Sequence, residues 1–130
     1  MTSRVTEIIV DSHDPLRQAN WWAEVLGYRV GPRHQAGWVP ILPWATEADR
    51  PEDDSYVWAP QVPSIVFVPV LEAKSLKNRV HLDVWPIDCS RDEEVQRLIA
   101  RGARTIDLGQ GEVSWVPMAD PEGNEFCVLG

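Results

Sequence analysis

The sequence predicts an α+β domain built from two similar halves. Residues 5–30 have the pattern of a strand, a helix and a second strand, and residues 80–108 repeat that order. A chain of 130 residues can bury one core of ordinary size but is too short for two independent ones, so the halves should share a domain. We expect one domain over 1–130, made of a first module 1–70, a connector 71–77 and a second module 78–130.

Composition and charge exclude several classes of partner. The net charge is −8, which disfavours binding to nucleic acid and to anionic membrane surfaces. There is no apolar run of the roughly 18 residues that a membrane span needs and no signal pattern at the N-terminus, so we expect a cytoplasmic protein. Cys89 and Cys127 have no metal-binding or redox spacing, and we expect two reduced thiols, with Cys127 a small core residue of an apolar strand.

The first half begins with a strand over 5–10 that is rich in β-branched residues and places Glu7 on one of its faces. The helix that follows should be capped by Asp14 and end at Gly27, a residue suited to a left-handed C-cap. The pair Trp21-Trp22 lies within this helix. Because adjacent helical residues point about 100° apart, one ring should face the core and the other a partner or the edge of a pocket.

After a strand at 28–30, proline and tryptophan become frequent between Gly31 and Pro63. We expect short strands at 38–42 and 56–58, an acidic loop at 47–55, and an apolar strand at 64–70. Three tryptophans in this segment are suited either to core and rim packing or to the wall of a small-molecule pocket, and both interpretations stay open. They are Trp38, Trp44 and Trp58.

The second half has a strand around His81 and an amphipathic helix over 90–101. Glycines at 109 and 111 and the run Asp120-Pro121-Glu122-Gly123-Asn124 are typical of turns. The remaining strands should lie at 104–108, 113–118 and 125–129.

Aligning the two halves at the ends of their helices places His81 opposite Glu7. Glu125 begins the last strand, where an inward-facing carboxylate needs a partner. If the sheet curves into a half-barrel, the three side chains converge, and imidazole and carboxylate suit Mn, Fe, Ni or Zn. The alternative is that each is an ordinary hydrogen-bonded residue at a strand end, with no metal. Asp83 lies on the same strand face as His81 and is predicted to orient the imidazole or to close the strand.

Three stretches of the chain resemble the glyoxalase/bleomycin-resistance/dioxygenase (vicinal oxygen chelate) superfamily. They are residues 14–28, 77–84 and 119–126. The resemblance implies paired βαβββ modules that form an open, half-barrel mixed sheet around a site where metal-dependent members hold a divalent ion with four ligands. His81 and Glu125 match two of these positions, Glu7 matches the first, where many members have His, and the strand at 65–68 offers no ligand.

The resemblance and the residues together imply a protein that binds a small organic molecule in the barrel cavity. In a metal-assisted lyase, isomerase or dioxygenase, Glu125 or Glu7 would transfer a proton. The alternative is a metal-free, ligand-sequestering protein like the bleomycin-resistance members, in which tryptophans stack on a cationic or aromatic ligand. A purely structural module is the third class. We also expect a homodimer, because a second copy would cover a tryptophan left exposed on the first helix.

Overall fold

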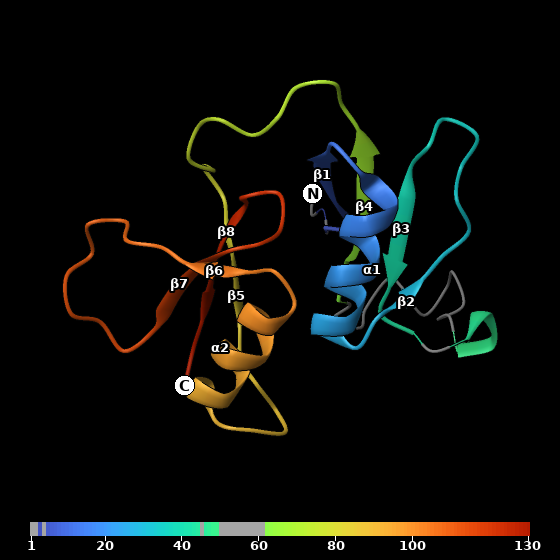
Figure 1. The fold of residues 1–130 in the computed structure, drawn as a ribbon. Coiled ribbons are helices and arrows are strands. Elements are labelled where there is room, and N and C mark those ends of the chain that lie inside the picture. Colours follow the sequence, from blue (N-terminus) through green and yellow to red (C-terminus); the bar gives the residue numbers. More distant parts are fainter. Residues whose placement is uncertain (1–2, 4, 45, 50–61) are drawn as a thin grey trace. The chain divides into compact units, whose positions relative to one another are not determined.

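The structure is a computed structural model that describes residues 3, 5–44, 46–49 and 62–130. The chain divides into two compact units, Met1–Glu72 and Ala73–Gly130, each of which is described by itself (Figure 1). The boundary falls inside the predicted connector. The first part of the predicted acidic loop forms a short 3₁₀ helix, η1 (Glu47–Asp49). The rest of that loop and the strand predicted at 56–58 lie outside the described residues.

The first unit is a four-stranded mixed sheet with one long helix. Its strands follow the order β1-β4-β3-β2, with β1 and β4 parallel and the other neighbours antiparallel. Helix α1 packs mainly against β3 and β4. The elements are β1 (Glu7–Ser12), α1 (Pro15–Leu26), β2 (Arg29–Val30), β3 (Val39–Leu42) and β4 (Ser64–Pro69).

The second unit repeats this architecture. Its sheet has the order β5-β8-β7-β6, again with one parallel pair, β5 and β8, and two antiparallel pairs. The α+β class and the two βαβββ modules predicted from the sequence are therefore confirmed. The elements are β5 (Leu82–Val84), α2 (Arg91–Ala100), β6 (Arg104–Thr105), β7 (Val116–Ala119) and β8 (Glu125–Val128).

Local sequence explains where both helices begin. The Asp14 side chain accepts a hydrogen bond from the Arg17 backbone N–H, and Pro15 occupies the first turn of α1. At α2, the Ser90 hydroxyl accepts from the Glu93 N–H while the Glu93 carboxylate accepts from the Ser90 N–H, a complete capping box. Helix α1 ends at Leu26, and the C-cap residue Gly27 has a left-handed φ of 66°, as predicted.

The two adjacent tryptophans of α1 are both buried, which corrects the prediction that one of them is exposed. Trp21 is 8% and Trp22 4% exposed, and their rings meet edge to face with centroids 5.0 Å apart. Viewed down the helix axis at about 100° per residue, the buried residues of α1 cover an arc of about 200°. Trp21 lies at one edge of this arc and Ala23 at the other. A helix with so wide a buried arc can place both rings inside.

Several strands are shorter than predicted. Strand β6 ends at Thr105 rather than at 108, whereas β1 keeps its predicted length but is shifted by two residues, to Glu7–Ser12. Beyond β6, backbone N–H groups donate to side-chain oxygens instead of to a neighbouring strand. The Gly109 N–H donates to Asp107 Oδ1, and the Leu108 N–H donates to Gln110 Oε1. The ladder therefore stops, and β7 begins only at Val116.

The strand registers agree with the predicted equivalence of Glu7 and His81. Pro40 of β3 pairs with Val66 of β4, and Pro117 of β7 pairs with Cys127 of β8, so Val66 and Cys127 are equivalent positions. Two residues earlier, the equivalent pair is Ser64 and Glu125. Since Glu7 pairs with Ser64, and one further step of the β5–β8 register places His81 beside Glu125, the equivalence extends to Glu7 and His81.

Candidate functional site

Four side chains with ionisable groups share one face of the second sheet. Strands β5 and β8 are parallel, and Asp83 pairs directly with Cys127. Side chains alternate along a strand, so Glu125 lies on the same face as Cys127, and Phe126 and Val128 lie on the other. His81 joins them because its imidazole contacts Asp83. We call these four residues, His81, Asp83, Glu125 and Cys127, the polar face.

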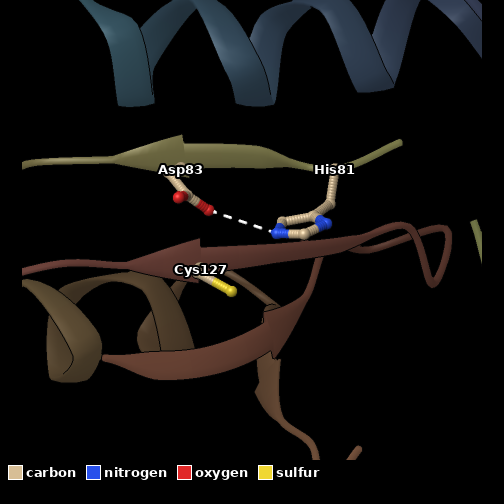
Figure 2. A group of neighbouring side chains, drawn as sticks. All are labelled: His81, Asp83 and Cys127. Carbon is tan, nitrogen blue, oxygen red and sulfur yellow. Dashed lines mark ion pairs between the residues drawn. The ribbon is translucent and has the colours of Figure 1, made fainter. Parts of the chain in front are cut away.

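Three members of the polar face form a compact cluster, shown in Figure 2. His81 Nε2 lies 3.3 Å from Asp83 Oδ1, and the two side chains project from the β5 segment toward Cys127 on β8. One potential ligand atom from each residue lies within 4.8 Å of the other two. The predicted contact between His81 and Asp83 is thus present.

The Cys127 thiol is buried and faces a carboxylate. Burial first, and then the negative charge of Asp83 and its hydrogen bond with the thiol, raise the pKa of Cys127 above its ordinary value, against a weaker opposing effect of Lys77. The residue is 6% exposed. A thiol held protonated in this way is a poor nucleophile. Both cysteines are free, as predicted, and Cys127 belongs to the core.

Glu125 is satisfied by partners from the connector. Its Oε1 lies 2.8 Å from Lys74 Nζ, and its Oε2 accepts a hydrogen bond of 3.0 Å from the Asn78 backbone N–H. Burial alone would raise the pKa of Glu125, but the ammonium group of Lys74 and the Asn78 hydrogen bond outweigh it and hold the pKa below its ordinary value. The partner that an inward-facing carboxylate requires is therefore a lysine of the same unit.

The turn before β8 sets the position of Glu125. Asp120 is fully buried, and its Oδ1 accepts 2.9 Å hydrogen bonds from the N–H groups of Glu122 and Asn124. Gly123 has a φ of 91°, which a residue with a side chain rarely adopts. Asn78 Nδ2 donates to Asn124 Oδ1 at 3.2 Å, so the segment before β5 is tied to this turn.

The other predicted site residues lie in the first unit. Glu7 is exposed at the start of β1, beside Ser64. Trp38 is 46% exposed and stacks on His34 with ring centroids 5.1 Å apart, whereas Trp44 is half-buried. Trp58 lies outside the described residues. The roles of these residues in binding stay predictions.

The donor set that the superfamily uses for its metal does not fit this chain. Both carboxylate oxygens of Glu125 already have partners, one of them a cation, so metal binding there would have to break the Lys74 ion pair. Ser64, the first-unit counterpart of Glu125, offers a hydroxyl in place of a carboxylate or imidazole. A metal held by Glu7, His81 and Glu125 therefore stays a prediction, and the Lys74 ion pair opposes it.

Sequence reasoning missed two residues of this site. Lys74 lies in the segment that the sequence predicts to be a connector, and nothing local signals its contact with Glu125, 51 residues away. Cys127 is predicted only as a core residue, although strand alternation places it two residues after Glu125 on the same face. That alternation was the available signal.

The two βαβββ modules and their sheet orders agree with the protein family whose sequence profile matches the chain. The profile of the family described as "Glyoxalase-like domain" matches residues 7–129, and the chain belongs to that family. No curated protein sequence matches the chain significantly.

Solved structures share the fold at low sequence identity. The fosfomycin resistance protein FosX from Listeria monocytogenes has a TM-score of 0.67 at 11% identity, covering 99% of this chain and 91% of that one. FosX from Mesorhizobium loti gives 0.64 at 12% identity, covering 99% and 92%. The oxidase ChaP-H2 gives 0.56 at 17% identity, covering 98% and 93%. Within the described residues, no helix has the length and apolar character needed to span a membrane.

Proposed function

We propose that this glyoxalase-like protein binds a small organic molecule through the polar face of its second unit. The observation that carries the proposal is the pair formed by His81 and Asp83, whose side chains are 46% and 50% exposed, with Asp83 in strand β5 and His81 directly before that strand. Polar groups held on a rigid strand and open to solvent are suited to orienting a ligand. Proteins of the same fold are named as an oxidase and as fosfomycin resistance proteins, which supports a small organic molecule as the ligand.

Charge favours a basic ligand. Glu125 is neutralised by Lys74, so Asp83 is the carboxylate of the polar face that is available to a cation. The net charge of −8 favours the approach of a positive ligand. Cation–π contacts from the tryptophans of the first unit stay a prediction from the sequence.

Binding is favoured over the metal-assisted isomerase or dioxygenase chemistry of the superfamily, because the residues do not fit its metal set. Proton transfer by Glu125 or Glu7 stays a prediction. Glu125 would have to release the Lys74 ammonium group before it could accept a proton from a substrate.

A thermal-shift screen tests the proposal. Cationic aromatic compounds should raise the melting temperature, while neutral compounds of the same shape should not. A ligand at 100 times its dissociation constant stabilises a protein by about 2.7 kcal/mol, which such a screen detects. Asp83→Asn should abolish the shift and Glu112→Gln, an exposed acid of the loop before β7, should preserve it. A shift that Asp83→Asn leaves unchanged would exclude the polar face.

A further inference from the structure

We propose that His81, Asp83 and Cys127 form a binding site for a thiophilic divalent cation such as Zn²⁺. Their potential ligand atoms lie within 4.8 Å of one another, and they combine an imidazole, a carboxylate and a thiol on one face of a parallel strand pair. Nitrogen, oxygen and sulfur donors together favour zinc over magnesium or calcium, which prefer oxygen alone. This site goes beyond the proposed ligand binding and does not depend on it.

The separation between the His81 and Asp83 donor atoms matches that of two ligands around a tetrahedral zinc ion, and the separations to Cys127 are at most 4.8 Å. With zinc–nitrogen and zinc–oxygen bonds of about 2.1 Å, two such ligands of a tetrahedron lie about 3.4 Å apart. His81 Nε2 and Asp83 Oδ1 lie 3.3 Å apart. A zinc–sulfur bond of about 2.3 Å places sulfur about 3.6 Å from the other two donor atoms. Cys127 Sγ lies within 4.8 Å of those atoms, so it has to move toward them by no more than about 1.2 Å.

The backbone holds these donors in place. Asp83 and Cys127 are direct partners in the β5–β8 register, and His81 directly precedes β5, two residues before Asp83 (Figure 2). A side-chain rotation of the thiol is the main adjustment needed, with no loop to order, so little conformational entropy opposes binding. Cys127 releases its proton to solvent when the cation binds, as thiol ligands do.

This set differs from the one that the superfamily resemblance implies. Both sets contain His81. In place of Glu125, whose carboxylate already has Lys74 and Asn78 as partners, the proposed set uses Asp83 and Cys127. Three protein ligands leave a fourth position for water or for a donor atom of a ligand. The half-exposed side chains of His81 and Asp83 keep that position accessible to solvent.

Titration of the chelator-treated full-length protein with Co²⁺, a spectroscopic substitute for Zn²⁺, tests the site directly. We expect one equivalent to produce the ligand-field bands of a tetrahedral ion and a thiolate-to-cobalt charge-transfer band, both displaced by Zn²⁺. Cys127→Ala should remove the charge-transfer band. His81→Ala and Asp83→Asn should weaken the affinity by at least the roughly 10–100-fold that loss of an outer-shell partner costs.

Two variants serve as matched controls. Cys89→Ser removes the other thiol, and His34→Gln removes an imidazole of the first unit, and both should bind Co²⁺ like the unchanged protein. His81 is half-exposed, so His81→Ala keeps the test valid even if Cys127→Ala fails to fold. The proposal is overturned if the unchanged protein shows no charge-transfer band, or if that band survives in Cys127→Ala. Because the readout needs no organic ligand, its failure is separate from failure of the proposed function.

Discussion

Replacing Lys74 by methionine removes the cation that pairs with Glu125 and keeps a side chain of similar length. The two side chains are 18% and 12% exposed, so the carboxylate left behind is largely cut off from water. It keeps the hydrogen bond from the Asn78 N–H. Breaking a fully buried ion pair costs about 3–5 kcal/mol, and losing a hydrogen bond to a charged group costs about 1.5–3 kcal/mol. With one partner retained and some solvent access, we expect a loss of about 2 kcal/mol.

Differential scanning calorimetry converts this loss into a measurable shift. An unfolding entropy of about 2.1 cal/mol/K per residue, applied to 130 residues, gives about 0.27 kcal/mol/K, so the melting temperature should fall by about 7 °C at pH 7. Lys77→Met is the matched control, since Lys77 and Lys74 are the two lysines of the chain and the Lys77 ammonium group is exposed. The control should change the melting temperature little.

The stability that the Lys74–Glu125 ion pair contributes depends on pH. The pKa of Glu125 in the fold is below its ordinary value of 4.5, so the ion pair contributes stability above that value and loses it as pH falls through the lower, folded pKa. The gap between the unchanged protein and Lys74→Met should therefore narrow below about pH 4.5. A double variant, Lys74→Met with Glu125→Gln, should be more stable than Lys74→Met alone because no unpaired charge remains. A gap under 2 °C at pH 7, or one that is constant with pH, would refute this account.

The other predictions concern caps, assembly and the acidic loop. Ser90→Ala should lower the free energy of unfolding by about 1 kcal/mol in chemical denaturation, because it removes half of the capping box; no loss would contradict that role. Gly27→Ala should cost about 1–2 kcal/mol through its left-handed φ of 66° alone, since nothing lies within 4 Å of the added methyl group. Light scattering at micromolar concentration should give a dimer mass, and a monomer mass would reject the assembly. Limited proteolysis should cleave first within the predicted loop 47–55, and primary cleavage in 64–70 would contradict that prediction.

Helix boundaries could be predicted because their signals are local. Asp14 with Pro15, Ser90 with Glu93, and Gly27 each act within one helical turn, and the structure shows each cap in place. The contact between His81 and Asp83 was predictable for a similar reason, since residues two apart on a strand share a face.

Contacts between distant segments could not be predicted in the same way. The burial of both Trp21 and Trp22 depends on how α1 packs across β3 and β4, and helical periodicity alone pointed to one exposed ring. Because both rings are buried, neither needs a second copy of the chain to cover it, and the expected homodimer rests on the family resemblance alone.

By itself, the sequence determined the order of elements, the duplication and the strand equivalence that aligns Glu7 with His81, because hydrophobic period and turn residues are written into short segments. Only the tertiary structure decided what the site residues bind. Lys74 reaches Glu125 across 51 residues, and the β5–β8 register brings Cys127 to Asp83. Both contacts join segments far apart in the chain, and their distances depend on strand register and connector path, which no local propensity specifies.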